Sequence, residues 1–551
     1  MDVRRRSQTE KEPAVNRYFV IPTVSLFAAS SGCISQVPKP RPNLLFIMTD
    51  QQRFDALGIA GRFPFLQTPN LDRLAAEGVW FTRAYTQCAV SAPVRASILT
   101  GLTVGNHRLF TNEHTREDPA TFGFTANLSF DQILVRAGYY TEHHGKLHTP
   151  THLADGYVNY VKRVRNGRTE WTGEQMKDYH DYIRSVYGKI PFGQGDQWDK
   201  TFAMPYTPDP IDRRYGMETN SEIAENELAY RPFTQPDAHG KLPINAEHSF
   251  TAWQSRNAIE ALKRAKASGK PFSVTCSFHF PHSPMLATEP YYGMYPVADM
   301  PVPASISDKM EGSPYMAANS RLKAPEFADP EKIRYMMSNY FGLVTEIDHW
   351  VGELLRTLDK LGVADNTMVI FISDHGEMLG SHGMREKNVF FEESARVPMI
   401  IRFPGRIKSG TKVDGYVSTI DLYATILDYM GVENTQKTDS RSLRDLIENK
   451  PKDKLRGKYV VTEWLYRGPT EPNYMIVQDG IKLYIPYSAT SKTPNVMHDL
   501  NADPGEVVNL LSPAHRTEKT IAAAGKLRSQ LVEWLREYQP EFVEGVIARQ
   551  L

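Results

Sequence analysis

The sequence has little cysteine, no excess of charge of either sign and no long apolar run beyond its first 40 residues. Only 3 cysteines occur in 551 residues, which excludes a disulfide-stabilised scaffold. Lysine plus arginine and aspartate plus glutamate each total 64, so the formal net charge is zero. This balance argues against a dedicated nucleic-acid-binding protein. No later segment has the roughly 20 apolar residues of a membrane-spanning helix. At about 150 residues per domain, the length predicts two to four domains, or one large domain and a smaller one.

Residues 1–33 have the pattern of a signal peptide. Arginines at positions 4–6 precede an apolar run over residues 18–29, and Ser30-Ser31-Gly32-Cys33 follows. The run is too short to span a membrane but suits the core of an export signal. The last four residues resemble a bacterial lipobox, with Ser30 where an aliphatic residue is usual. We expect export to the periplasm, with Cys33 either lipidated, as an anchor to a bacterial membrane, or simply removed. The alternative is a disordered tail with a chance apolar patch.

Residues 43–454 predict the large domain, after a proline-rich linker at 34–42. Apolar strands alternate there with amphipathic helices, which is typical of an α/β fold with a doubly wound, mostly parallel sheet and helices on both faces. We expect strands at 44–48, 139–141, 272–278, 367–372 and 397–403, and helices at 68–78, 130–138, 250–266, 331–361 and 418–430. Cys88 and Cys276 fall within this domain, where we expect buried thiols rather than a bridge.

Two other regions differ in composition. Residues 455–551 predict a small C-terminal α+β domain with an antiparallel sheet, in which Asp479-Gly480 forms a hairpin turn. Residues 155–248 are loop-rich and aromatic, with a basic cluster at Lys162, Arg163, Arg165 and Arg168. This insertion is either a solvated face or part of a substrate surface for an anionic polymer.

Polar residues follow the predicted buried strands. Asp50-Gln51 ends the first strand, and Asp374-His375 ends another. A lone aspartate at such a place most often caps a helix, but two aspartates side by side raise each other's pKa unless a cation lies between them. The pattern therefore predicts a divalent metal site. Hard oxygen ligands favour calcium or magnesium, and the imidazole of His375 makes manganese a further option.

The stretch from Ser91 to Gly101 carries the candidate nucleophile. Pro93 suits a first helical turn, so Ser91 is expected at a helix N-terminus, where free N–H groups favour an anion. Arg95 then lies one turn above it on the same face. Two lysines, Lys146 and Lys387, and an arginine near a metal make a site for a tetrahedral oxyanion, although a single lysine is more often a surface residue. His148 alternates with Lys146 on an extended segment, so the two lie on one face. His282 lies in a loop stiffened by prolines and could be structural or catalytic.

These motifs resemble those of the type I, formylglycine-dependent sulfatases of the alkaline phosphatase superfamily. The resemblance extends over residues 43–404 and 497–509. It includes the metal pairs Asp50-Gln51 and Asp374-His375, the Gly145-Lys146-Leu147-His148 segment, His282-Ser283-Pro284, and the Glu386-Lys387 loop. Ser91-Ala92-Pro93-Val94-Arg95 matches the family's Cys/Ser-x-Pro-x-Arg signature and is the most specific of these. Cys88 does not fit that signature, because Val90 stands in the place of the proline.

The resemblance implies a mechanism and its cofactors. Ser91 is oxidised to formylglycine, and its hydrate joins Asp50, Gln51, Asp374 and His375 around Ca²⁺, with Mn²⁺ or Mg²⁺ as alternatives. Arg95 holds the hydrate. Further roles are implied for Lys146, as a ligand of the sulfate oxygens, for His282, as the acid that protonates the leaving alcohol with Lys387 beside it, and for His148, as the base that releases sulfate.

The resemblance also implies partners. Serine at position 91 is typical of the bacterial class matured by a radical-SAM sulfatase-maturing enzyme, and export suits the hydrolysis of a sulfated polysaccharide or oligosaccharide. Two alternatives stay open: a phosphonate monoester or phosphodiester hydrolase of the same superfamily, and a non-catalytic glycan-binding lipoprotein. The sequence leaves the sugar, the sulfate position and the oligomeric state undetermined.

Overall fold

The computed structural model describes residues 40–112, 123–125, 127–150, 239–242, 244–283, 285–316, 325–451, 453–466, 468 and 472–551, with scattered residues between 153 and 188. The predicted signal peptide with Cys33, most of the linker at 34–42 and most of the insertion at 155–248 lie outside these residues. Of the insertion's basic cluster, Arg165 and Arg168 belong to a two-residue strand pair, β4 (Val164–Arg165) and β5 (Arg168–Thr169).

The large domain is built on an eight-stranded sheet. Its order is β10-β2-β11-β9-β1-β7-β3, and β12 also pairs with β2. The strands are β1 (Asn43–Asp50), β2 (Val79–Tyr85), β3 (Tyr140–Gly145), β7 (Phe272–Pro281), β9 (Thr367–Ser373), β10 (Arg396–Val397), β11 (Met399–Arg402) and β12 (Thr411–Ser418). β1, β3, β7 and β9 pair in parallel, whereas β11 runs antiparallel to both β9 and β2. The mostly parallel α/β sheet predicted from the sequence is confirmed.

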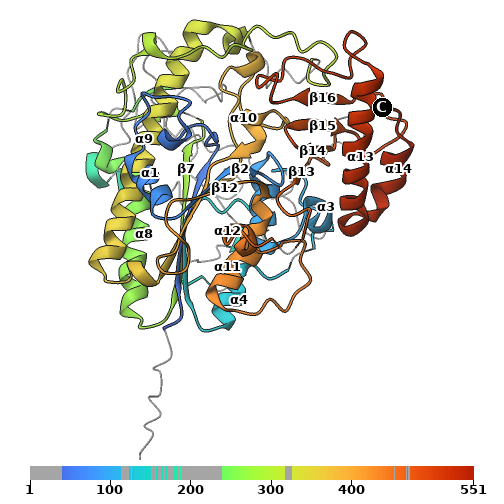
Figure 1. Cartoon of the computed structure of the whole chain (residues 1–551). Coiled ribbons are helices and arrows are strands. Elements are labelled where there is room, and N and C mark those ends of the chain that lie inside the picture. The colour runs from blue at the N-terminus through green and yellow to red at the C-terminus, as the bar shows by residue number, and fades with distance from the viewer. Residues whose placement is uncertain are drawn as a thin grey trace, which may run out of the picture. The chain divides into compact units, whose positions relative to one another are not determined.

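Helices cover both faces of this sheet. One set contains α1 (Pro69–Ala76), α8 (Phe250–Ala267) and α9 (Pro330–Lys360). The other contains α2 (Ser91–Thr100), α4 (Phe130–Arg136) and α11 (Leu422–Met430). Figure 1 shows α8 and α9 on one side and α4 and α11 on the other.

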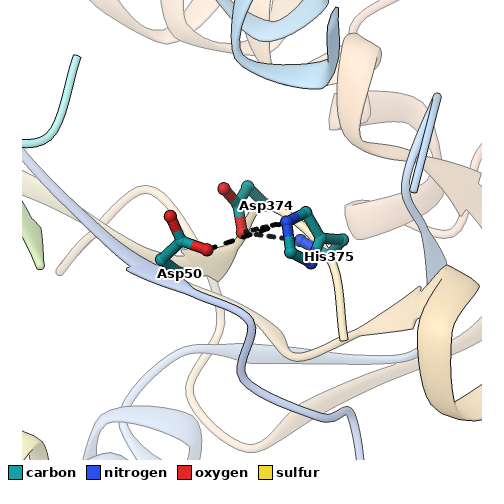
Figure 2. Close-up of side chains that lie close together, drawn as sticks. All are labelled: Asp50, Asp374 and His375. Atoms are coloured by element: carbon teal, nitrogen blue, oxygen red, sulfur yellow. Dashed lines mark hydrogen bonds and ion pairs between the residues drawn. The ribbon is translucent and has the colours of Figure 1, made fainter. Parts of the chain in front are cut away.

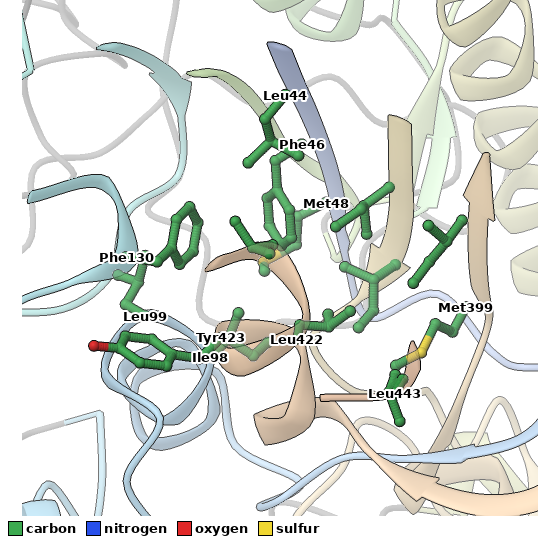
Figure 3. Close-up of a cluster of buried hydrophobic side chains, with 14 of the residues drawn as sticks. Leu44, Phe46, Met48, Ile98, Leu99, Phe130, Met399, Leu422, Tyr423 and Leu443 are labelled. Atoms are coloured by element: carbon green, nitrogen blue, oxygen red, sulfur yellow. The ribbon is translucent and has the colours of Figure 1, made fainter. Parts of the chain in front are cut away.

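Alternate side chains of β1 enter two separate cores. Leu45 and Ile47 pack against α1, α8 and α9, while Phe46 and Met48 pack against α2, α4 and α11 (Figure 3). Since successive side chains of a strand point to opposite faces, a continuous apolar run is what a strand covered on both faces requires. All eight residues of β1 are accordingly buried.

Several observed elements differ from the predicted ones. The strand expected at 397–403 is divided into β10 and β11, with Pro398 between them, because proline has no N–H for the ladder. β2 and β12 were not predicted, since both strands mix exposed and buried positions and carry no continuous apolar run. The helix expected from residue 418 begins at Leu422.

The C-terminal region contains a four-stranded antiparallel sheet, as predicted. Its strands are β13 (Tyr459–Glu463), β14 (Tyr474–Gln478), β15 (Ile481–Ile485) and β16 (Val496–Asp499), and β16 was not expected. Asp479 and Gly480 both have positive φ, at 52° and 79°, as a two-residue hairpin turn requires. The helix α13 (Glu518–Tyr538) packs Leu527, Leu531 and Leu535 against this sheet, and α14 (Val543–Ala548) follows.

The remaining sequence predictions concern thiols and membranes. Cys88 and Cys276 are both buried and free, as expected. Among the residues that the structure describes, no helix has the length and apolarity to cross a membrane.

Candidate active site

The carboxyl ends of neighbouring parallel strands bring the predicted site residues together. β1 lies between β7 and β9, and Thr49 is opposite Ser373. Asp50, the last residue of β1, and Asp374, which follows β9, therefore meet at one edge of the sheet, and the backbone N–H of Asp374 donates to the carbonyl of Thr49 at 3.2 Å. This edge is where open α/β sheets bind their ligands.

Asp50, Asp374 and His375 form a buried group that can hold a metal ion (Figure 2). One ligand atom of each lies within 4.8 Å of the others, and all three residues are fully buried. His375 Nε2 is 3.7 Å from Asp50 Oδ1 and from Asp374 Oδ1. Among the described residues, Asp50 Oδ1 has no hydrogen-bond partner. A buried carboxylate oxygen without a donor is costly, so the group fits a divalent cation that would supply the missing partner.

Charge keeps Asp50 ionised in this setting. Burial opposes ionisation, but the positive charges around the carboxyl, first of all that of Lys146, hold the pKa of Asp50 well below its usual value. Lys146 Nζ donates to Asp50 Oδ2, and both side chains are buried. Burial itself lowers the pKa of Lys146, an effect that Asp50 partly offsets.

Gln51 connects the metal-binding group to Lys387. It adopts a left-handed backbone conformation with φ 70°, and its N–H donates to Asp374 Oδ1 at 3.1 Å. Tyr340, from α9, donates its hydroxyl to the Gln51 carbonyl at 2.9 Å. The side-chain Oε1 accepts from Lys387 Nζ at 2.5 Å. Because an amide oxygen has two lone pairs, one remains for a cation.

Ser91 is the first residue of α2, as the proline two places later predicts. Its side chain is completely buried, and its Oγ is 2.8 Å from His375 Nε2. The candidate nucleophile therefore lies directly beside the metal-binding group, at a helix N-terminus whose free N–H groups favour negative charge.

Arg95 lies one turn further along α2 and connects three strand ends. Its Nε donates to Asp374 Oδ2 at 2.8 Å, and one Nη donates to the Lys146 carbonyl and to Ser277 Oγ, each at 2.8 Å. The other Nη is 3.4 Å from Asp50 Oδ2. A planar guanidinium offers donors in a fixed fork, so Arg95 locks the carboxylates in place.

Lys387 and His282 form the other side of the site. Lys387 Nζ is 2.9 Å from His282 Nε2, and His282 Nδ1 is 2.6 Å from the Ser283 carbonyl. Burial, with the charge of Lys387, holds the pKa of His282 well below its usual value. Burial and the charge of Lys146 do the same for His148, which is in a left-handed conformation with φ 54°. The charges of both Lys146 and Lys387 lower the pKa of each of these two histidines.

All ten site residues predicted from the sequence lie in this one region. Polar residues that contact them and were not predicted include Ser277 on β7, Tyr340 on α9 and Glu377 after β9. Glu377 follows the Asp374-His375 pair by only two residues, so a carboxylate at that strand end was the available signal. Nothing in the sequence indicates the other two, because a serine in a strand and a tyrosine in a helix are ordinary.

Comparison with known proteins identifies the family. A family model described as sulfatase matches residues 42–432, well over half of the chain. The chain belongs to the sulfatase family. A second family model, described as the C-terminal region of N-sulphoglucosamine sulphohydrolase, matches residues 380–536. Membership makes this protein a sulfuric ester hydrolase of the alkaline phosphatase superfamily, which removes the support for a non-catalytic glycan-binding lipoprotein.

Similar proteins span most of the chain. An arylsulfatase of Clostridium perfringens is 28% identical over 92% of this chain and 96% of its own. The multifunctional alkaline phosphatase superfamily protein PehA of Trinickia caryophylli is 30% identical over 85% and 91%. An N-acetylglucosamine-6-O-sulfatase of Bacteroides thetaiotaomicron is 26% identical over 96% and 91%. A solved structure with its substrate D-glucosamine-2-N,6-O-disulfate shares the fold, with TM-score 0.64, 24% identity and coverage of 91% and 98%.

Proposed function

We propose that this sulfatase removes sulfate from a sulfated carbohydrate, using Ser91 in its formylglycine form and a divalent cation held by Asp50, Gln51, Asp374 and His375. The observation that carries the proposal is the position of Ser91 Oγ, 2.8 Å from His375 Nε2, beside the carboxylate oxygen of Asp50 that lacks a donor. A relative that acts on N-acetylglucosamine 6-O-sulfate and a fold neighbour with a disulfated glucosamine bound favour a sugar as the carrier of the sulfate.

Hydrated formylglycine supplies two hydroxyls on one carbon, one to attack sulfur and one to expel sulfate afterwards, and the cation supplies positive charge next to them. An unmodified serine has no second hydroxyl and would remain as a sulfate ester. Calcium best suits the oxygen-rich donor set, and Mn²⁺ or Mg²⁺ are alternatives.

The side chains of the site neutralise the sulfate and move protons. Lys146 and Lys387 offset the negative charge of the sulfate oxygens, and their effect is large because both side chains are buried. Arg95 fixes the carboxylates against which the nucleophile is oriented. The proton for the leaving alcohol is the one shared between Lys387 Nζ and His282 Nε2. His148 accepts the proton of the second hydroxyl when sulfate departs.

Mass spectrometry of the peptide that contains Ser91 tests this proposal. The protein is produced together with a radical-SAM sulfatase-maturing enzyme, our proposed maturation partner, and the peptide is expected to be two hydrogens lighter than the serine form. The modified fraction should be proportional to the turnover of p-nitrophenyl sulfate. Full activity in protein with only unmodified serine contradicts the proposal.

The alternative function is hydrolysis of phosphonate monoesters or phosphodiesters. It is favoured by the 30% identity to PehA, whose name describes a multifunctional member of the superfamily. Paired assays with p-nitrophenyl sulfate and bis-p-nitrophenyl phosphate separate the two. We expect the larger kcat/KM for the sulfate ester, and a larger kcat/KM for the phosphodiester overturns our assignment.

We also propose that the protein is exported and acts in the periplasm, with Cys33 as the lipid attachment site. This rests on the arginines, apolar run and lipobox-like residues of the first 33 positions. Labelling with a radioactive fatty acid, compared between the wild type and C33A, tests it. Label in the membrane fraction of the wild type alone is expected, and equal labelling of both excludes Cys33.

A further inference from the structure

The carboxylate of Glu377 is buried against the site and accepts three hydrogen bonds. Glu377 is 1% exposed. Its Oε1 accepts from the backbone N–H of Leu379 at 3.0 Å and of Glu386 at 2.6 Å, and its Oε2 accepts from Gln51 Nε2. Among the described residues, its side chain forms no hydrogen bond with Ser91, Asp50 or Asp374, so any effect that it has on the reaction passes through the groups that it holds.

The first of these groups is the amide of Gln51. Lys387 can only donate, and the carboxylate oxygens of Glu377 accept here from two backbone N–H groups and from Gln51. The amide therefore must turn its oxygen to Lys387, at 2.5 Å, and its NH₂ to Glu377. With the opposite orientation, two donors would meet at Lys387 and two acceptors at Glu377. The carboxylate thus decides which end of Gln51 faces the site.

The second group is the loop that carries Lys387. Glu377 Oε1 fastens both ends of this loop, at Leu379 and Glu386, and the N–H of Met378 donates to the Glu386 carbonyl at 2.8 Å. Leu379 and Glu386 have positive φ, at 47° and 60°, a conformation that non-glycine residues adopt only when other contacts enforce it. Lys387 follows directly, so the same carboxylate places its backbone.

We propose that Glu377 is a positioning residue that keeps the carbonyl oxygen of Gln51, rather than its NH₂, on the side of Lys387 and the metal-binding group. The inference deepens the proposed function and rests on it, since it takes Gln51 as an oxygen donor to the cation. Glu377 thereby links the residues that bind the cation to the Lys387–His282 pair that supplies the proton.

The variant E377Q reverses the polarity of this contact. The new amide has one oxygen, which the N–H groups of Leu379 and Glu386 require, so its NH₂ faces the NH₂ of Gln51. Whichever way Gln51 then turns, two donors meet. In the double variant Q51E/E377Q, the carboxylate introduced at position 51 accepts both from the NH₂ at position 377 and from Lys387. The hydrogen bond between positions 51 and 377 is thereby restored, with position 377 now donating and position 51 accepting.

Calcium affinity of the metal-free protein, measured by isothermal titration calorimetry, tests the inference without using activity. Removing such an outer partner costs about 10- to 100-fold in metal affinity, which is the loss expected for E377Q. The double variant should bind with at least one third of the wild-type affinity. Thermal unfolding in EDTA checks that each variant is folded.

Glu463→Gln is the matched control. Glu463 on β13 is another fully buried carboxylate, and it likewise accepts from two backbone N–H groups, of Val104 at 3.0 Å and Gly105 at 3.2 Å, and from glutamine amides, that of Gln87 at 2.6 Å. E463Q is expected to lose stability but to keep the wild-type calcium affinity.

The outcomes separate the inference from the proposed function. If the wild type binds neither Ca²⁺ nor Mn²⁺, the metal-dependent function fails. If the wild type binds calcium and E377Q binds it equally well, or if the double variant is as weak as E377Q, the positioning role is overturned. Should E377Q not fold, a folded double variant with the stated affinity supports the inference, and a double variant that is unfolded or weak overturns it.

Discussion

Two clusters of buried charged side chains differ in whether their hydrogen-bonding atoms all have partners. In the first, Lys482 on β15 lies 2.8 Å from carboxylate oxygens of both Glu392 and Glu506, and these two carboxylates also accept from the hydroxyls of Tyr85 and Tyr484 at 2.8 and 2.7 Å. In the second, at the edge of the large sheet, Asp50 keeps an oxygen without a donor among the described residues.

The difference teaches how a buried polar cluster can be interpreted. A cluster whose donors and acceptors are all matched within the chain rigidifies the fold, and the Lys482 cluster joins the C-terminal sheet to the loop after β9. A buried group left unmatched needs another explanation, such as a ligand that completes it. The Asp50 cluster is therefore expected to affect chemistry, and the Lys482 cluster stability.

The largest expected effect is the loss of activity in S91A. Removing a nucleophile costs enzymes on the order of 10⁴-fold or more in kcat, and we expect at least that loss towards p-nitrophenyl sulfate. Ser97→Ala is the matched control, because Ser97 lies on the same helix, is equally buried and is 2.9 Å from the Nε2 of His107. S97A should keep the wild-type kcat. Comparable losses of kcat in both variants would show that the loss comes from a disturbed α2 rather than from removal of the nucleophile.

The second effect is the loss of stability in K482M. Two buried carboxylates lose their cation, which costs about 3–5 kcal/mol, measured by urea unfolding. The control is K412M, whose exposed pair with Asp414 is worth about 1 kcal/mol or less. Calcium affinity should be unchanged in both variants. A selective loss of calcium binding in K482M would contradict the division between the two clusters.

The third effect is stabilisation by the metal. Calcium at 100 times its dissociation constant should raise the free energy of unfolding of the metal-free protein by about 2.7 kcal/mol. K482M should gain the same increment, while D50N should gain none, because it lacks the carboxylate that awaits the cation. An equal gain in D50N would show that calcium stabilises the protein from another site.

The fourth effect is a pH dependence that belongs to neither cluster. Burial raises the pKa of Glu346 on α9 from 4.5 to about 7, although Ser249 donates to it. The folded protein then holds a proton that the unfolded chain releases above pH 4.5, so this contribution to stability is present below 4.5 and lost as the pH rises through 7. E346Q should flatten the decline by up to about 1.4 kcal/mol per pH unit. Unfolding curves between pH 5 and 7 that match those of the wild type would contradict this.

Structural features that follow from one residue type and one physical requirement could be predicted from the sequence. The uninterrupted apolar run of β1 predicts a strand covered on both faces, and aspartates at two strand ends predict a shared cation. β2 was missed because its burial depends on partners far away in the chain, including β12. Glu377 and Tyr340 were missed for a related reason: their importance lies in the hydrogen bonds to Gln51, and no periodicity records those.

The burial of Ser91 limits the time at which this residue could be modified. Its side chain has no exposed surface at the start of α2, so a maturing enzyme can reach it only while the chain is still open. If Ser91 is oxidised as proposed, oxidation competes in time with folding. Each molecule is then fixed as active or inactive when it folds. The specific activity of a preparation therefore reflects the ratio of the rate of oxidation to the rate of folding during synthesis.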